Sequence, residues 1–201
     1  YLQVSQMNPA ISQTMEAICA VTVRLPIGTN LALLHFIWMQ LSGALLSSRG
    51  ALFPALQAIG LTPQEVCRAW AAFRSGGWQI AELLSGWEIY VQAQGQWQSC
   101  HYEGYYPKAA DLTAYWRPNL KGCRSKHYYP PAQKALPAIV LGLIARVGRV
   151  NGQRVAVITQ LVRADPDDPS EANWQTAVVQ QAAKTLAEDE MPVFHAGFKI
   201  R

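Results

Sequence analysis

Two apolar, β-branched runs joined by Asn151-Gly152 constrain this chain more than any other feature. The first run extends from Ala138 to Val147 and the second from Arg154 to Arg163. An Asn-Gly pair between two such runs is the strongest short-range signal for a β-hairpin, because both residues tolerate the positive φ of a type I′ turn. The sequence therefore predicts two long antiparallel strands at the centre of the C-terminal half.

The preceding part of the chain, residues 29–90, has the periodicity of helices. Apolar residues between Leu31 and Leu41 recur at spacings of three and four, which gives a helix one apolar face. The tetrapeptide that begins at Thr62 and ends at Glu65 is a capping box with proline at the first helical position, so another helix is predicted to begin there. Short helices joined by glycine turns are compatible with a helix-turn-helix DNA-binding unit, and also with any small helical bundle.

The segments that flank the hairpin complete a mixed pattern. The expected elements are extended segments at 87–98 and 102–116, a helix at 171–188 and a strand at 191–200. The sequence thus predicts a mixed α/β fold in two parts. Residues 1–90 form a helical region, and residues 91–201 form a mixed sheet with flanking helices.

Composition limits the classes of protein to which the chain can belong. Half of its 201 residues are apolar, which is enough to build a core and excludes a disordered chain. The apolar run from Leu31 to Leu46 is too short for a bilayer and is interrupted by polar residues, so no membrane partner is expected. The four cysteines form no Cys-x-x-Cys pair, which predicts a reducing, cytoplasmic location. Because the chain opens on Tyr1, a truncated or processed start is expected.

Charge is concentrated in two segments, although the whole chain carries only +4. Residues 164–190 hold seven carboxylates and one lysine, whereas residues 111–135 hold five cations and one carboxylate. Between Tyr115 and Tyr129 the cations alternate with aromatic residues. Arginine and lysine bind backbone phosphates, and aromatic rings stack on unpaired bases, so this segment is a candidate DNA contact. The alternative is a solvated loop whose aromatic rings pack on the sheet. The candidate DNA-binding residues are Trp116, Arg117, Lys121, Arg124, Lys126 and His127.

Asp111 and His195 are the candidate catalytic residues and metal ligands. Asp111 begins an Asp-Leu-Thr motif that is followed by Arg117-Pro118, and His195 lies in the motif Phe-His-Ala-Gly-Phe. Two-metal phosphoryl chemistry requires ligands on neighbouring strands, because two divalent ions must be held close together. The residues alone leave two alternatives open. Asp111 could be a strand-end aspartate that caps a nearby amide, and His195 could be a partly buried, hydrogen-bonded histidine.

These two motifs, in this order around a hairpin and a helix, resemble the first- and second-aspartate motifs of bacterial insertion-sequence DDE transposases. The resemblance covers most of the chain and implies a partial ribonuclease-H-like core in residues 91–201, with its first and fourth strands side by side. It implies metal-dependent DNA cleavage and strand transfer in transposition, with Mg²⁺ or Mn²⁺ as cofactor. It also implies double-stranded element ends as the partner and allows a homodimer. By this match Asp111 is the first metal ligand, and His195 occupies the position of the second.

Two departures from the family pattern bear on activity. At His195 an imidazole replaces a carboxylate, which removes a charge and a bridging oxygen from a magnesium site. The third acidic residue of the family, a glutamate on a later helix, has no counterpart before Arg201. This copy is therefore expected to be truncated or degenerate, and inactive by itself. The alternatives are a catalytically inactive DNA-binding remnant and an unrelated α/β interaction domain.

Overall fold

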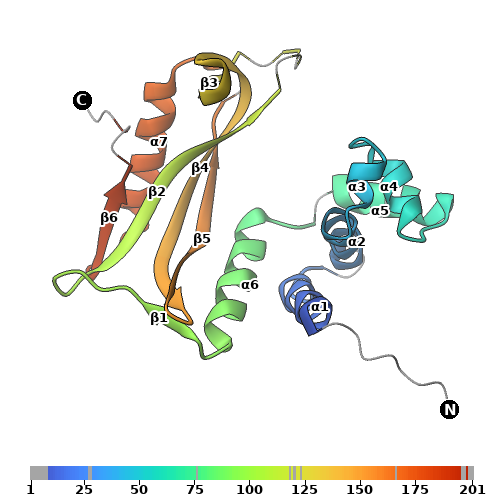
Figure 1. Cartoon of the computed structure of the whole chain (residues 1–201), viewed down its shortest axis with the longest axis horizontal. Helices are drawn as coiled ribbons and strands as arrows, with labels where there is room; N and C mark the ends of the chain where they lie inside the picture. The colour runs from blue at the N-terminus through green and yellow to red at the C-terminus, as the bar shows by residue number, and fades with distance from the viewer. Residues whose placement is uncertain are drawn as a thin grey trace. The chain divides into compact units, whose positions relative to one another are not determined.

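Figure 1 shows the computed structural model, which describes residues 9–26, 29–75, 77–117, 119, 121–122, 124–165, 167–195 and 198. The chain divides into two compact units, Tyr1–Tyr90 and Val91–Arg201. The first unit is helical, and the second contains the sheet. Among the described helices, none is both long and apolar enough to cross a membrane.

Helices form the regular structure of the first unit, as their apolar periodicity predicts. They are α1 (Pro9–Thr22), α2 (Thr29–Leu41), α3 (Ala44–Ser47), α4 (Leu52–Ala58), α5 (Pro63–Ser75) and α6 (Ile80–Ala93), the last of which ends in the second unit. The core of this unit gathers Phe36 and Met39 from α2, Leu56 from α4 and Val66 from α5, all of them buried. This core therefore joins α2, α4 and α5.

The predicted capping box at the start of α5 is confirmed. The Thr62 amide donates to Glu65 Oε2 at 2.8 Å, and the Glu65 amide donates to Thr62 Oγ1 at 3.4 Å. These reciprocal bonds satisfy amide groups that have no partner inside the helix. Pro63 is the first residue of α5, where its missing N–H costs nothing.

The expected extended segment at 87–98 is wrong for most of its length. Residues up to Ala93 belong to α6, and only β1 (Trp97–Ser99) is extended. Gly86 of α6 lies against the backbone of α1, where an added Cβ would meet Val21 O at 3.3 Å. This close helix packing overrides the strand propensity of the Trp, Ile, Tyr and Val residues that follow Gly86.

The second unit contains a mixed sheet and one long helix. Its other elements are β2 (Tyr106–Trp116), β3 (Lys126–Tyr129), the 3-10 turn η1 (Pro130–Ala132), β4 (Lys134–Val150), β5 (Gln153–Arg163), α7 (Glu171–Lys184) and β6 (Glu190–Phe194). Strand β4 pairs antiparallel with β1, β2, β3 and β5, and β2 pairs in parallel with β6. Because β2 and β5 occupy opposite edges of β4, the order across the sheet is β5-β4-β2-β6.

The predicted hairpin is confirmed, and its turn has the expected geometry. Val150 pairs with Gln153, and the turn residues Asn151 and Gly152 have φ of 52° and 79°. Positive φ at both positions is the requirement of a type I′ turn. The other three expected elements are present with different bounds, since β2 begins at Tyr106, α7 ends at Lys184 and β6 ends at Phe194. Residues 196–197 and 199–200 of the expected last strand lie outside the described residues.

Helix α7 covers one face of the sheet (Figure 1). Ser170 caps its N-terminus by accepting from the Asn173 amide at 3.4 Å. Val178 packs against β2 and β4, and a Cβ at Gly142 of β4 would overlap its side chain. Alternate residues of β2, such as the buried Ala110, face this helix. The residues between them face the opposite side of the sheet.

The described part of the chain is therefore a mixed α/β protein with seven α-helices and a six-stranded mixed sheet. The sheet positions the candidate site, because the predicted site residues lie in β2 and β3, in the connection between these two strands, or directly after β6.

Candidate metal and nucleic-acid site

The parallel pairing of β2 with β6 brings the two candidate ligands to neighbouring positions. The register runs from Tyr106↔Glu190 to Ala110↔Phe194. Asp111 and His195 each follow the last paired residue of their strands. Paired strands lie about 4.8 Å apart. The two chain segments therefore reach the same part of the sheet at the two residues that the sequence singles out.

Asp111 lies on the face of the sheet opposite α7. Its neighbour Ala110 is buried against that helix, and strand side chains alternate between faces, so the exposed Asp111 carboxylate is on the other side. Asp111 Oδ1 accepts a hydrogen bond from the Leu112 amide at 2.8 Å. Across the sheet Asp111 pairs with Leu143 of β4. The local bond to Leu112 is the capping role that the sequence left open, and it occupies only one of the two carboxylate oxygens.

The donor set of Asp111 and His195 fits one divalent ion better than a pair. Together they offer one carboxylate and one imidazole, and no group of three or more His, Cys, Asp or Glu side chains is found among the described residues. Imidazole nitrogen suits manganese or zinc, whereas magnesium prefers an octahedron of oxygen atoms. Two adjacent magnesium ions would need further carboxylates.

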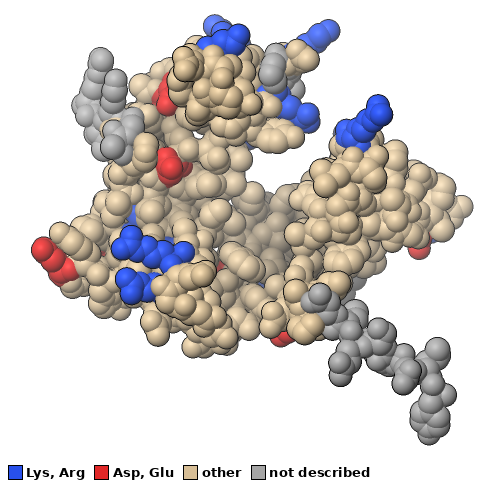
Figure 2. Space-filling model, in the orientation of Figure 1, with Lys and Arg blue, Asp and Glu red and all other residues tan. Residues whose placement is uncertain are grey.

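The predicted DNA-contact cations lie where β2 ends and β3 begins. Arg117 follows β2, Lys126 opens β3, and Lys121 and Arg124 lie in the connection between them; all four are exposed. Figure 2 shows basic side chains at the end of the sheet where β3 lies in Figure 1. Pro118 of the same motif lies outside the described residues. The segment 112–133 contains no carboxylate, so no acidic residue within the segment offsets the charge of these cations.

Arg124 lies within electrostatic range of a carboxylate on the acidic turn before α7. The pKa of Asp168 is lowered, first by a hydrogen bond from the Asn173 side chain, then by the Ser170 amide, and also by the charge of Arg124. Part of the Arg124 charge is therefore matched within the chain.

Trp116 and His127 lie on the α7 face of the sheet rather than on a free surface. The Trp116 indole donates to His127 O at 3.2 Å, and its ring packs against the cluster that includes Trp174. His127 Nδ1 lies 3.6 Å from Glu171 Oε2 of α7. The half-buried Trp116 ring is thus part of the core, which is the alternative that the sequence left open for the aromatic residues of this segment.

Two tyrosines of this segment that are not among the candidate DNA-binding residues occupy the exposed face instead. Tyr115 and Tyr128 are 59% and 52% exposed, and the Arg117 guanidinium lies over the Tyr115 ring, 5.0 Å from its centroid. The signal that could have found them is alternation. Once Trp116 is placed in the core, its strand neighbour Tyr115 must face the other way.

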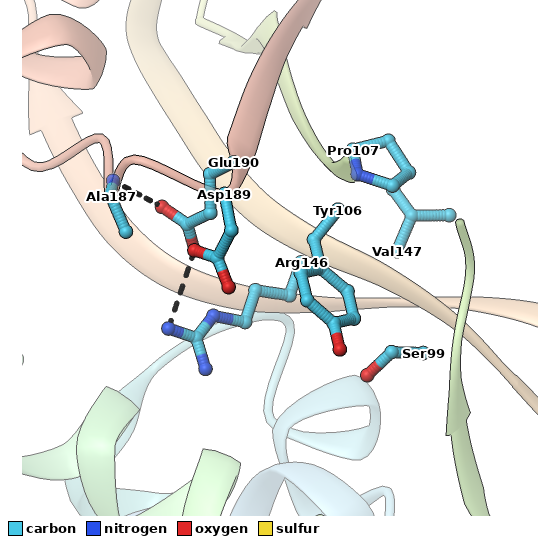
Figure 3. A pocket seen from close by; sticks show the side chains of 8 residues that line it. All are labelled: Ser99, Tyr106, Pro107, Arg146, Val147, Ala187, Asp189 and Glu190. Atoms are coloured by element: carbon cyan, nitrogen blue, oxygen red, sulfur yellow. Dashed lines mark hydrogen bonds and ion pairs between the residues drawn. The ribbon is translucent and has the colours of Figure 1, made fainter. Parts of the chain in front are cut away.

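A separate polar pocket lies at the opposite end of β2. Its volume is about 200 Å³, and Figure 3 shows Arg146 extending toward Glu190. Glu190 Oε2 accepts from the buried Lys108 at 2.9 Å, and Glu190 Oε1 lies 3.3 Å from Arg146. The lining residues are Ser99, Tyr106, Pro107, Arg146, Val147, Ala187, Asp189 and Glu190.

Glu190 of this pocket forms ion pairs with Lys108 and Arg146, which belong to neighbouring strands. Burial raises the pKa of Glu190, but the hydrogen bonds from Lys108 and the Ala187 amide and the nearby Lys108 and Arg146 charges lower it by more, and the net pKa is below its usual value. Lys108 also donates to Thr185 O at 2.6 Å. This cluster therefore ties β6 and the end of α7 to β2 and β4.

No protein-family model, curated protein or solved structure matches this chain. Its function is therefore argued from the chemistry and geometry of its own residues.

Proposed function

We propose that this chain belongs to a DNA transposase of the DDE type, with a helical region followed by elements of the catalytic core. The observation that carries the proposal is the β2–β6 register, because Asp111 and His195 each come directly after its last pair, Ala110 with Phe194. The strand order β5-β4-β2-β6, with α7 between β5 and β6 in the chain, agrees with a ribonuclease-H-like core. The cations at the end of β2 and in β3 lie in the same sheet and supply a surface for DNA phosphates.

In this proposal Asp111 and His195 hold one divalent ion near the DNA backbone. A bound ion supplies Lewis-acid stabilisation of charge that develops on a phosphoryl oxygen. Asp111 contributes the negative charge and one or both oxygens, while the imidazole of His195 contributes one neutral donor. Arg117 and Lys126 position the phosphate backbone by charge alone. Because the pair provides only one carboxylate, we expect weak metal binding and no efficient two-metal cleavage.

A second candidate function is DNA binding without cleavage. The observation that favours it is His195 itself, since an imidazole at the second ligand position weakens a magnesium site while leaving the basic surface intact. The two candidates make the same prediction for DNA affinity. They differ in whether Asp111 and His195 act together as metal ligands.

Calorimetric titration of the whole chain with Mn²⁺ and with Mg²⁺ tests the catalytic proposal. We expect Mn²⁺ to bind more tightly than Mg²⁺, because one donor is a nitrogen. Asp111→Ala should weaken Mn²⁺ binding by at least about tenfold. Loss of a residue that only hydrogen-bonds to a metal ligand already lowers metal affinity by about that factor. His195→Asp should strengthen binding of both ions by restoring a charge and a second oxygen.

Asp167→Ala is the matched control, because Asp167 is an exposed carboxylate that follows β5, and β4 separates β5 from β2 and β6. It should leave both affinities unchanged. If His195→Asp has no effect on either ion, Asp111 and His195 are not joint ligands. The catalytic proposal would then fail, and DNA binding alone would remain.

A further inference from the structure

Strands β2 and β3 carry two tyrosines and two cations on one face at the end of the sheet. We call Tyr115, Arg117, Lys126 and Tyr128 the tyrosine platform. Each of the four is exposed, and the two rings are among the most exposed large hydrophobic side chains in the described part of the second unit. The platform alternates in sequence with Trp116, His127 and Tyr129, and the Trp116 ring contacts both of the others.

Strand pairing places the platform on the face opposite α7. His127 lies beside Glu171 of α7, and Trp116 packs with Trp174 of the same helix. Since side chains alternate along a strand, Tyr115 and Tyr128, the immediate neighbours of Trp116 and His127, face away from that helix. The 5.0 Å separation between the Arg117 guanidinium and the Tyr115 ring centroid places Arg117 on the same side as Tyr115.

The two cations lie on either side of one residue of β4. The Arg117 amide donates to Pro137 O at 2.9 Å, and Lys126 is the strand partner of Pro137 on the other edge. Two strand spacings separate their backbones by about 10 Å. Tyr115 pairs with Ile139, and Tyr128 pairs with Ala135. Four residues along β4 and two strand spacings put the tyrosine backbones about 16 Å apart.

We infer that the tyrosine platform binds an unpaired DNA strand next to the Asp111 site, an inference that rests on the proposed function. Tyrosine rings can stack only on base faces that are free, whereas a duplex presents base edges and phosphates. Arg117 and Lys126 lie between the rings and hold the phosphates that connect the stacked bases. The Arg117 guanidinium over one face of Tyr115 is itself a plane on which a base can stack.

The platform and the candidate metal ligand belong to one row of side chains. Asp111, Thr113, Tyr115 and Arg117 are alternate residues of β2 and its continuation, so they share one face. The Tyr115 backbone is about 13 Å from that of Asp111. A DNA strand that spans both tyrosines and continues beyond Tyr115 along this row reaches the Asp111 carboxylate. The unpaired strand at a cut or frayed element end has the chemistry that this row recognises.

Fluorescence anisotropy with the whole chain tests the inference. The probes are a blunt labelled duplex and the same duplex with an unpaired thymidine tail of about six nucleotides, enough to span about 16 Å at 3.4 Å per stacked nucleotide. We expect the tail to tighten binding. Tyr115→Leu and Tyr128→Leu should each weaken binding of the tailed probe by roughly 5-fold to 100-fold, the range expected for loss of one stacked base.

Three controls keep this result specific. Tyr115→Phe and Tyr128→Phe retain the ring and should retain the gain from the tail. Tyr102 is 60% exposed and belongs to the connection between β1 and β2, so Tyr102→Leu should leave both probes unaffected. The two leucine variants at the platform should bind the blunt duplex as the unchanged chain does.

The outcomes separate this inference from the proposed function. If the tail brings no gain, or if the gain persists in the Tyr115→Leu/Tyr128→Leu variant, the platform does not bind an unpaired strand, while blunt-duplex binding leaves the proposed function standing. If neither probe binds, both the inference and the DNA-binding part of the proposed function are overturned.

Discussion

At the scale of single residues, Gly142 shows how closely α7 approaches the sheet. It sits within β4, where a side chain would overlap Val178 of α7. The local sequence is an apolar run with one glycine. It does not predict the contact with α7, because periodicity does not reveal which helix crosses a strand. Val178 is 1% exposed, so little free space exists to relieve a clash.

Gly142→Ala should therefore destabilise the chain by about 1–3 kcal/mol through overpacking. The reason is the contact with Val178, so the same substitution made in a Val178→Ala background should cost much less. Urea unfolding of the four proteins in this cycle measures the difference. If Gly142→Ala lowers the free energy of unfolding equally in both backgrounds, Val178 is not the side chain that an added Cβ at position 142 would contact.

The individual site residues were predicted with uneven success. The sequence correctly predicted that the cations between Arg117 and Lys126 are exposed, because a charged segment without acidic partners is costly to bury. It placed Trp116 among the DNA contacts, whereas the structure packs this ring into the core. Composition does not fix which of two neighbouring aromatic residues faces out, since that depends on strand register.

At the scale of elements, the buried pair of Lys108 and Glu190 fastens β6 to β2. Their side chains are 5% and 6% exposed, so either charge left alone would be buried without its main partner. Glu190→Leu should destabilise the chain by about 3–5 kcal/mol, the cost of breaking a buried pair. Adding Lys108→Met should recover most of that stability, because no unpaired lysine then remains. Denaturant unfolding measures both.

The dependence of the unfolding free energy on pH in the acid range gives an independent check of this ion pair. The pKa of Glu190 is lower in the folded chain than its usual value of 4.5. The pair therefore contributes its full stability above that value and loses it as pH falls through the folded-state pKa. The unchanged chain should lose stability below about pH 4.5 more steeply than the double variant. If the free energy of unfolding of both proteins falls equally with pH, folding does not lower the pKa of Glu190.

The hairpin, the capping box and α7 were predictable because their signals are local. Asn151-Gly152 and the Thr62-to-Glu65 box encode their own backbone geometry. The predicted strand at 87–98 was wrong because its aromatic and β-branched residues resemble a strand, while contact between Gly86 and α1 favours continued helix. Such a contact joins residues that lie far apart in sequence, so no short window contains it.

At the scale of the whole molecule, the basic end of the sheet predicts salt-sensitive DNA binding. Replacing Arg117, Lys121, Arg124 and Lys126 by alanine removes up to four cations that could neutralise phosphates. The slope of log affinity against log salt should then fall by about 0.9 for each phosphate that the protein no longer neutralises. Anisotropy titrations of a blunt duplex over a range of salt concentrations measure the slope.

A second set of exposed cations provides the comparison. Arg24, Arg49, Arg68 and Arg74 belong to the helical unit, and their replacement removes the same charge. If this set changes the slope and the first does not, DNA contacts the helical unit, as a helix-turn-helix would require. If neither set changes it, the basic segment is a solvated loop.

The organisation of the whole chain was only partly predictable. Periodicity distinguishes the helical unit from the unit that contains the sheet, and the hairpin identifies the central strands. The neighbourhood of Asp111 and His195 depends on a parallel pairing across an intervening hairpin and helix. Only the resemblance to a known family, and no local pattern, suggested it.

The same long-range pairing means that β2 cannot pair with β6 until β6 has been synthesised. Lys108 and Glu190 are 82 residues apart, so a ribosome that adds about 5–20 residues per second needs roughly 4–16 s to supply the strand that covers β2. Until then β2 is an edge strand whose amide and carbonyl groups could pair with another nascent chain. Lys108 lies near the start of β2, and a lysine on an uncovered edge strand opposes such pairing. Lys108 thus disfavours pairing of β2 with another chain until β6 covers this edge, and it then forms the ion pair with Glu190.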